Sequence, residues 1–332
     1  MRFIVTGHME PQWNLAAEEY YLLNGEGDFF LLWRNAPSVI IGRNQNAYSE
    51  VDTAYAAQRE IPVVRRLSGG GAVFHDLGNV NFSFLTDAQT GGNIDFSRFT
   101  APIIKALSTM GVEAVLDGRN DLMVDGKKIS GNAQGTLGRL DGTRRLLHHG
   151  TLLFSVDMAS LSAVLKGDPD KLSSKGVDSV KSRVINIRDI PSYCGPQTVE
   201  DFMEALGLSS ELVAETPTAE DEAAIEKLAR EKYATWEWNF GRSGDFSARR
   251  SRRFPYGKVE VEFRTAHGRL EDVRITGDYF GFYDISVLEN ALLGALMTKE
   301  DILSRLTDEL VEGAVHGMKK EELAALLLGL DK

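Results

Sequence analysis

The sequence has a single cysteine and no long apolar run. Cys194 stands alone among 332 residues, so no disulfide can form within the chain, which fits a reducing compartment. No stretch comes near the roughly 20 apolar residues that a membrane-spanning helix needs. The first residues also lack the charged and apolar layout of a signal peptide. These absences predict a cytoplasmic protein that does not cross a membrane.

The motifs of several common enzyme classes are also missing. The chain has no G-x-x-x-x-G-K-[ST] phosphate loop, and Phe74 stands where the glycines of a dinucleotide fingerprint would continue. It has no H-E-x-x-H motif or cysteine pair for zinc, and no G-x-S-x-G motif around a serine nucleophile. The sequence therefore lacks the motifs that would best indicate a P-loop NTPase, a dinucleotide-dependent dehydrogenase, a zinc protease or an α/β-hydrolase.

Positive charge is in the minority, with 37 Lys+Arg against 48 Asp+Glu and a net charge of −11. Broad nucleic-acid binding needs a cationic surface, so we expect no nucleic-acid partner. A local basic site for a nucleotide stays compatible with this balance. Glycine, by contrast, is abundant: 32 of 332 residues exceed the usual share of about 7%.

The apolar periodicity predicts helices and strands that do not alternate regularly. Residues 13–23 and 97–110 have helical spacing, and the pair Asp125-Gly126 predicts the type I′ turn of a hairpin. Between the first of these helices and residue 156, most of the predicted elements are strands. This pattern favours an α+β fold with mixed and antiparallel sheets over a doubly wound parallel sheet.

A length of 332 residues predicts two domains, at about 150 residues per domain. The segment 241–253 is rich in glycine, serine and arginine, and we interpret it as a linker. It divides the chain into a larger domain, 1–244, and a smaller α+β domain, 245–332. In the smaller domain the pattern predicts two strands followed by amphipathic helices.

The densest polar cluster surrounds three consecutive glycines, Gly69 to Gly71. Residues without Cβ atoms let the backbone approach a ligand and adopt positive φ, and successive N–H groups can form an anion-binding nest. Arg65 and Arg66 just upstream can pair with a phosphate or a carboxylate. A tight turn with solvated arginines is the alternative, but the combination with Ser68 favours a ligand-binding loop.

A second cluster carries Asn120, Asp121 and Lys128 around the predicted hairpin. Strand alternation puts Lys128 and Ser130 on one face, and a lysine that faces inward indicates an anion. Asp121 can hold Lys128 or a Mg²⁺ ion. An exposed turn is the alternative interpretation of this segment.

A third cluster contains His148, His149 and Gly150. Adjacent residues of a strand point to opposite faces, so the two histidines are poorly placed to share a metal. We favour a packed or hydrogen-bonded histidine beside a close backbone approach at Gly150.

These clusters belong to a series of segments that spans nearly the whole chain. In order the segments are PQWNLAAEEYYL, VIIGRNQN, RRLSGGGAVFHDLGNVNFSF, GRNDLMVDGKKISGNAQ, HHGTLLFSVD, KGVDSVKSRVINI, TWEWNFG and RFPYGKVEVEF. In this order they resemble the lipoate–protein ligases of the biotin/lipoate ligase superfamily, and the segment with the three glycines is the most specific. The resemblance implies a large catalytic domain followed by a small accessory domain.

The resemblance implies an ATP-dependent ligase. Such enzymes activate lipoate as lipoyl-AMP, release pyrophosphate, and transfer the lipoyl group to one lysine of an acceptor domain. The implied acceptors are the E2 subunits of 2-oxoacid dehydrogenases and the glycine cleavage H protein. Lipoate or octanoate and ATP would be the substrates and Mg²⁺ the cofactor, and nothing in the sequence requires more than a monomer.

The resemblance also implies the site residues. Lys128 matches the ligase lysine that bridges the acyl carbonyl and the phosphate oxygens, and Asp121 is the candidate for holding Mg²⁺ or orienting Lys128. ATP is expected against Arg66, Gly71, Ala72, Val73, Phe74, Asn120 and Lys128. Lipoate is expected against Gly70, Gly71, His75, Lys128, His149 and Gly150, with Val73 and Phe74 shaping the acyl tunnel.

Other interpretations stay open at this stage. Biotin ligases carry a G-R-G-R-x-G-R loop, which is absent here. An octanoyl or lipoyl transferase without ATP would need a cysteine nucleophile, and Cys194 lies outside the motifs that carry the chemistry, which favours a ligase. A non-catalytic lipoate- or adenylate-binding protein is the third hypothesis, although the intact Lys128 and Asp121 speak against it. The arginine-rich stretch 247–253 either helps to dock acidic acceptor domains or is a solvated linker.

Overall fold

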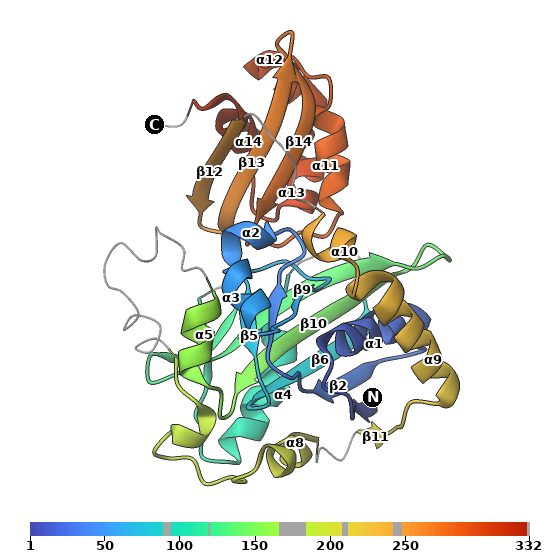
Figure 1. Ribbon diagram of the computed structural model, residues 1–332, viewed down its shortest axis with the longest axis vertical. Helices are drawn as coiled ribbons and strands as arrows, with labels where there is room; N and C mark the ends of the chain where they lie inside the picture. The colour runs from blue at the N-terminus through green and yellow to red at the C-terminus, as the bar shows by residue number, and fades with distance from the viewer. Residues whose placement is uncertain (89–93, 119, 166–183, 208–211, 242–247, 331–332) are drawn as a thin grey trace.

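The computed structural model describes residues 1–332 except 89–93, 119, 166–183, 208–211, 242–247 and 331–332 (Figure 1). In the described part, the larger half of the molecule is built on a sheet with the strand order β11-β1-β2-β6-β10-β9-β8-β7. Its strands are β1 (Arg2–Val5), β2 (Phe29–Trp33), β6 (Asn79–Asp87), β7 (Val115–Asp117), β8 (Asp121–Val124), β9 (Lys127–Gly138), β10 (Arg144–Leu153) and β11 (Val213–Ala214). In this order, every neighbouring pair from β2 through β6, β10, β9 and β8 to β7 is antiparallel. In contrast, β1 pairs parallel with β2 and with β11. The predicted α+β fold with mixed sheets is confirmed.

A second, small sheet carries the glycine loop. Its order is β4 (Val63–Arg65), β3 (Ser38–Ile41) and β5 (Val73–His75), with β3 parallel to β4 and antiparallel to β5. Residues 66–72 join β4 to β5. The loop is therefore held at both ends by strands that pair with the same neighbour.

Strand alternation divides the core of the large sheet into two layers. In β2, Phe30 packs in the cluster with α4 (Ser97–Ser108) and α8 (Val199–Gly207). Its neighbours Phe29 and Leu31 pack in the cluster with α1 (Pro11–Asn24) and α9 (Ala219–Leu228). Both faces are covered, which is why all residues of β2 are buried.

The C-terminal part has a core of its own. Strands β12 (Ala248–Phe254), β13 (Gly257–Ala266) and β14 (Arg269–Gly277) form an antiparallel sheet that is covered by helices (Figure 1). The helices are α11 (Ile285–Leu292), α12 (Lys299–Arg305), α13 (Asp308–Ala314) and α14 (Lys320–Leu328). One apolar cluster, whose buried members run from Phe254 to Leu327, holds these elements together.

The predicted linker is wrong for residues 248–253, because they form β12. This strand pairs with β13 over its whole length, and Phe254 enters the apolar core. Two arginines of this strand face carboxylates: Arg249 Nη2 lies 2.6 Å from Glu260 Oε2, and Arg253 Nη1 lies 3.6 Å from Asp278 Oδ2. The earlier residues of the predicted linker, 242–247, lie outside the described part.

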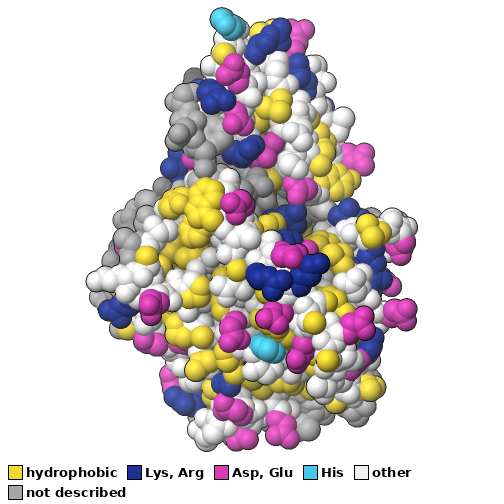
Figure 2. Space-filling view, turned by 45° about the vertical axis from the view of Figure 1, so that its right-hand side comes forward, with side chains coloured by type: hydrophobic (Ala, Val, Ile, Leu, Met, Phe, Trp, Pro, Cys, Tyr) yellow, Lys and Arg dark blue, Asp and Glu magenta, His cyan; other side chains and the backbone are white. Residues whose placement is uncertain are grey.

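Several helices begin at polar caps. Asp52 accepts from the Tyr55 N–H and begins α3 (Thr53–Gln58), while Thr307 accepts from Leu310 N–H and begins α13. The remaining helical segments are α2 (Ala47–Glu50), α5 (Met158–Val164), α10 (Trp236–Phe240), a 3₁₀ turn (Ile187–Asp189) and a π-helical turn (Ala229–Tyr233) that extends α9. Within the described residues, no helix has the length and apolar content needed to span a bilayer. On the face shown in Figure 2, side chains of both charges are interspersed.

Arg65 is a structural residue, contrary to the prediction that it pairs with a ligand. Its guanidinium is buried and donates to five backbone carbonyl oxygens, those of Gly42, Arg43, Gln45, Trp238 and Asn239. These bonds join the turn after β3 to α10. Since neighbouring residues of an extended chain point to opposite sides, Arg66 faces the other way.

We predict that Arg65→Ala lowers the free energy of unfolding by about 3 kcal/mol or more, because several buried carbonyl groups lose their donors. Urea unfolding measures this change. Arg230→Ala is the matched control, since that side chain is 67% exposed, and its effect should stay within about 0.5 kcal/mol. Equal stability of the two variants would contradict the structural role of Arg65.

Candidate functional site

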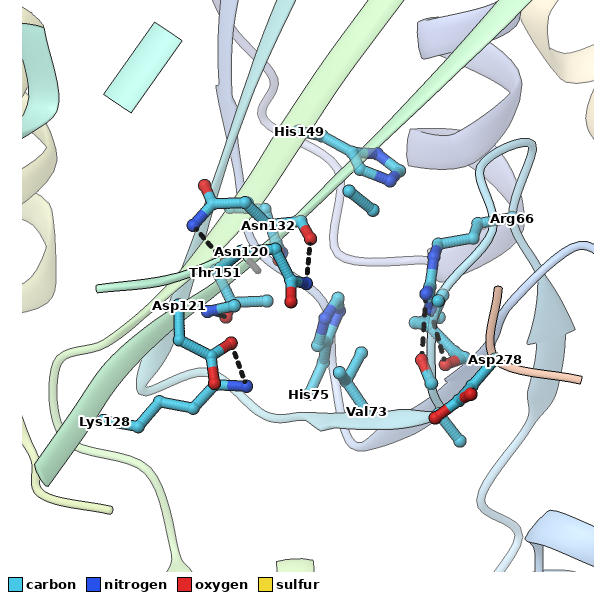
Figure 3. Close-up of a pocket in the computed structure, with 18 of the residues that line it drawn as sticks. Arg66, Val73, His75, Asn120, Asp121, Lys128, Asn132, His149, Thr151 and Asp278 are labelled. Carbon is cyan, nitrogen blue, oxygen red and sulfur yellow. Dashed lines mark hydrogen bonds and ion pairs between the residues drawn. The ribbon is translucent and has the colours of Figure 1, made fainter. Parts of the chain in front are cut away.

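A cavity of about 270 Å³ is lined by residues from the glycine loop, β5, β8, β9, β10 and the C-terminal part (Figure 3). Its apolar lining includes Leu15, Trp33 and Ile40. In Figure 3, Lys128 and Asp121 lie on one side and Arg66 and Asp278 on the other, with His75 and Val73 between them. The cavity brings together the predicted residues Arg66, Gly70, Gly71, Ala72, Val73, His75, Asn120, Asp121, Lys128, His149 and Gly150.

Lys128 and Asp121 form an ion pair across the β8–β9 hairpin. The Lys128 Nζ lies 2.8 Å from Asp121 Oδ1, and both side chains are about one third exposed (34% and 35%). The hairpin turn has φ of 50° at Asp125 and 74° at Gly126, as a type I′ turn requires. The prediction that Asp121 approaches Lys128 is therefore confirmed.

Lys128 lines the cavity, as predicted, but the prediction that it shares a face with Ser130 is wrong, because the strand register shifts. Leu122 pairs with Ser130, but the next residue, Met123, pairs with Lys128, so one extra residue is inserted in β9. The irregularity removes the simple alternation between Lys128 and Ser130. A Cβ atom at Gly131 would lie 2.9 Å from Lys128 Nζ, so the ammonium occupies the space that a side chain there would fill.

Asn120 is fixed by reciprocal bonds to β9. Its Nδ2 donates to the carbonyl oxygen of Asn132, and the Asn132 Nδ2 donates to the carbonyl oxygen of Asn120 at 3.0 Å. The Asn132 Oδ1 is buried and has no hydrogen-bond partner among the described residues. The pair thus leaves an acceptor at the cavity wall. Arg119, which precedes Asn120, lies outside the described residues.

Arg66 braces the glycine loop from inside. Its Nη2 donates to the carbonyl oxygens of Gly69 at 2.6 Å and Gly71 at 2.8 Å. Gly70 adopts a φ of +89°, which favours glycine, and its N–H donates to the Tyr279 carbonyl oxygen at 3.3 Å. Burial lowers the pKa of Arg66 to about 10, which still leaves it charged at neutral pH.

Phe74, one of the predicted site residues, does not line the cavity. In β5, Val73 and His75 line the cavity, whereas the Phe74 side chain packs in an apolar cluster with Val39 and Ile41. The reason is strand alternation. The prediction that the Phe74 side chain shapes the acyl tunnel is therefore wrong, and contact with ATP through its backbone stays a prediction.

His75 is neutral, and its hydrogen bonds assign its tautomer. The Asn14 Nδ2 donates to the backbone carbonyls of His8 and Arg34 and to Asn35 Oδ1, which leaves Asn35 Nδ2 to donate to His75 Nδ1 at 3.1 Å. The proton of the ring then sits on Nε2, which is buried and without a partner in the described part. Burial, with a contribution from Arg66, lowers the pKa of His75 to about 3.

His149 is a hydrogen-bonded histidine, as expected. Its Nδ1 lies 2.8 Å from Glu18 Oε1 and its Nε2 lies 2.6 Å from Ser68 Oγ. The next residue, Gly150, is tightly packed, since a Cβ there would lie 2.5 Å from the Phe82 ring. The described residues contain no group of three or more His, Cys, Asp or Glu side chains that could hold a metal ion.

Among the residues near the cavity that were not anticipated, Glu18 and Asp278 carry carboxylates. Glu18 lies in α1, where its spacing of three from Leu15 and four from Leu22 would have indicated a carboxylate on the buried face of the helix. Asp278 follows β14 and lines the cavity from the C-terminal part. Nothing local in the sequence around Asp278 indicates this, because its place depends on how the two parts of the chain meet.

Comparisons with known proteins show the family to which the chain belongs. A family model described as "Lipoyl protein ligase A/B catalytic domain" matches residues 10–209, and "Bacterial lipoate protein ligase C-terminus" matches residues 243–327. Lipoate–protein ligase 1 of Staphylococcus aureus is 41% identical over 315 residues, 93% of this chain and 94% of that protein. The chain belongs to the lipoate–protein ligase family. Lipoate–protein ligase LplJ of Bacillus subtilis is 40% identical over 328 residues, 96% of this chain and 97% of that protein.

Solved structures of lipoate–protein ligases share the fold. P. falciparum LipL1, in complex with lipoate, has a TM-score of 0.77 at 26% identity and covers 99% of both chains. The archaeal "bi-partite" ligase of Thermoplasma acidophilum has a TM-score of 0.61 at 30% identity over 74% of this chain and 98% of its own. Lipoate–protein ligase A bound with ATP has a TM-score of 0.57 at 29% identity, over 72% of this chain and 98% of its own.

Cys194 stands apart from the cavity of this lipoate–protein ligase. The thiol is free and exposed, and Cys194 is not among the residues that line the cavity. A thiol that carries the acyl group must reach the reacting carbon. The position of Cys194 therefore gives no support to an acyl transferase mechanism without ATP.

We predict that His75 makes stability fall with acid. Between pH 6.5, the ordinary pKa of histidine, and pH 3 the unfolded chain binds a proton at His75 that the folded chain does not, so stability is complete above pH 6.5 and is lost as the pH falls. From pH 7 to pH 5 this group accounts for about 2 kcal/mol.

Urea unfolding of the native protein and His75→Gln at both pH values measures the difference. His148, whose pKa burial also lowers, is present in both proteins and cancels. Identical pH dependence of the two proteins would contradict a neutral His75.

Proposed function

We propose that the cavity is the place where this lipoate–protein ligase activates lipoate with ATP and passes the lipoyl group to an acceptor lysine. One observation carries the proposal: two cations, Lys128 and Arg66, face a cavity whose other lining residues include Leu15, Trp33 and Ile40. An apolar acyl chain and an anionic nucleotide need both kinds of surface in one place.

Lys128 is the proposed catalytic residue in both steps. In the first step, a carboxylate oxygen of lipoate bonds to the α-phosphorus of ATP, and the bond to pyrophosphate breaks. In the second step, the amine of the acceptor lysine bonds to the acyl carbon, loses a proton, and AMP leaves with the electron pair of its C–O bond. Both steps develop negative charge on oxygen, and a fixed ammonium stabilises it without forming a bond. Asp121 acts as the group that orients Lys128.

We assign the remaining cavity residues to the two substrates as the family resemblance implies. The nucleotide side consists of Arg66, Gly71, Ala72, Val73 and Asn120, with the backbone of Phe74. The acyl side consists of Gly70, His75, His149 and Gly150, and we assign Gly71 and Lys128 to both substrates. The neutral Nε2–H of His75 is suited to an oxygen acceptor, because a buried donor without a partner is costly.

We propose that Mg²⁺ enters with the nucleotide. Magnesium in phosphoryl-transfer sites takes one or two carboxylates, and phosphate oxygens complete its shell. Asp121 fits such a partial ligand set, since the described residues provide no complete metal cage around it. The ion would neutralise part of the phosphate charge there.

We propose that residues 1–244 form the catalytic domain and residues 245–332 an accessory domain. Two observations support the division: the C-terminal part has its own apolar core, and the archaeal relative matches 74% of this chain over 98% of its own length. That archaeal ligase is described together with its E2 lipoyl domain, which supports lipoyl domains as acceptors here. We further propose that the enzyme works as a monomer in the cytoplasm, where ATP is available.

The function is tested with purified protein, ATP, Mg²⁺ and lipoate or octanoate, with mass spectrometry of the products. We expect acyl-AMP and pyrophosphate, and an acylated lysine once an E2 lipoyl domain is added. Formation of neither product would overturn the proposal, and binding of lipoate without acyl-AMP would favour a non-catalytic binding protein.

We predict that Lys128→Ala slows acyl-AMP formation by about 10²–10³-fold, because the variant loses the charge that stabilises the transition state. Lys127→Ala is the matched control, since the neighbouring side chain is exposed and does not line the cavity. Pyrophosphate release measures both rates, and unchanged release by Lys128→Ala would exclude the proposed role. Thermal unfolding should be the same for all three proteins within a few degrees.

A further inference from the structure

A path of hydrogen-bonded side chains runs through the interior from α1 to the glycine loop. Glu18 and Ser68 are both 0% exposed, and the ring of His149 lies between them, 2.8 Å from Glu18 Oε1 and 2.6 Å from Ser68 Oγ. Arg66 Nε donates to the same Ser68 oxygen at 3.0 Å. The path therefore joins a buried carboxylate to a buried guanidinium by way of His149 and Ser68.

The donors and acceptors of this path have one consistent direction. A carboxylate only accepts, so His149 donates from Nδ1 to Glu18. The Ser68 hydroxyl then donates to His149 and accepts from Arg66, and the described residues offer it no other acceptor. All three bonds point from Arg66 toward Glu18, an arrangement in which each bond polarises the next.

Glu18 also acts on Arg66 through its charge. The other hydrogen bonds of the Arg66 guanidinium go to backbone carbonyls, which carry no net charge. Burial lowers the pKa of Arg66, and the charge of Glu18 acts in the opposite direction. Glu18 Oε2 is buried without a hydrogen-bond partner in the described part, so Oε1 alone accepts the bonds from His149 and Ser83.

We propose that Glu18 is a positioning residue for the nucleotide: through His149 and Ser68 it holds the guanidinium of Arg66, and Arg66 in turn holds the carbonyls of Gly69 and Gly71. Those carbonyls set the direction of the peptide groups that face the cavity. The inference rests on the proposed function, because it assigns to Glu18 and Ser68 an effect on ATP binding. Neither side chain needs to touch ATP.

The order serine, histidine and carboxylate also occurs in hydrolase triads, but the geometry here does not suit one. A nucleophilic serine must present its oxygen to the substrate. Ser68 is fully buried, is not among the residues that line the cavity, and already accepts a hydrogen bond from Arg66. The path is therefore suited to holding Arg66 rather than to attacking an acyl group.

The test uses the full chain and measures pyrophosphate exchange with ATP and lipoate varied separately. Glu18→Gln keeps the shape of the side chain and removes its charge, and Ser68→Ala interrupts the path beyond His149. We expect each variant to raise the KM for ATP by about tenfold, the effect of losing one charge-assisted hydrogen bond. Ser68→Ala should leave the KM for lipoate within about twofold, because His149, on the proposed acyl side, keeps its hydrogen bond to Glu18.

The double variant shows whether the two residues act together. If Glu18 acts through Ser68, Glu18→Gln with Ser68→Ala raises the KM for ATP no further than the larger single effect. If the double variant instead raises the KM for ATP by the product of the two single effects, the proposed path is wrong. It is also wrong if both single variants keep a KM for ATP within about twofold of the native value. If Glu18→Gln does not fold, Ser68→Ala alone decides between these outcomes.

Glu19→Gln is the matched control. Glu19 is the next residue of α1, is also buried, and binds Lys232 Nζ at 2.6 Å and the Tyr233 hydroxyl at 2.7 Å. We expect this variant to melt at a lower temperature with an unchanged KM for ATP. A rise equal to that of Glu18→Gln would overturn the inference. Absence of pyrophosphate exchange in the native protein would instead contradict the proposed function.

Discussion

The positive charge on the buried guanidinium of Arg66 constrains the rest of the site. A buried ion is tolerated only where hydrogen bonds replace the water that it has lost. Arg66 finds them in the carbonyls of Gly69 and Gly71 and in Ser68, so the loop that would face a nucleotide is shaped by the needs of the arginine behind it. Gly69 and Gly71 supply carbonyl oxygens to Arg66, whereas Gly70 is the residue of the three that adopts a positive φ.

The second cation, Lys128, is held by different means. It is partly exposed, and its partner is a single carboxylate on the neighbouring strand. A pair of this kind in contact with solvent contributes little to stability, which leaves the ammonium free to exchange part of its contact for a ligand oxygen. The Arg66 side of the cavity is thus rigid, because the guanidinium is buried. The Lys128 side is adaptable, because the ammonium is partly exposed.

Local signals in the sequence predicted the features that depend on neighbours in the chain. The Asp125-Gly126 turn follows from the positive φ that both residues tolerate, and the approach of Asp121 to Lys128 follows from the turn. The extra residue in β9 could not be predicted, because it arises from pairing with β8. The strand β12 was concealed by its arginines, of which Arg249 pairs with Glu260 on the neighbouring strand. Asp278 depends on contact between two distant parts of the chain.

The hydrogen bond from the Gly70 N–H to the Tyr279 carbonyl oxygen joins the glycine loop to the C-terminal part. The Gly70 N–H can serve one acceptor well, so a ligand oxygen that takes it competes with the Tyr279 carbonyl. Such competition is reciprocal: the factor by which docking of the C-terminal part weakens the ligand equals the factor by which the ligand weakens docking. A ligand oxygen that took this amide proton would therefore couple the filling of the loop to the docking of a separate sheet and its helices.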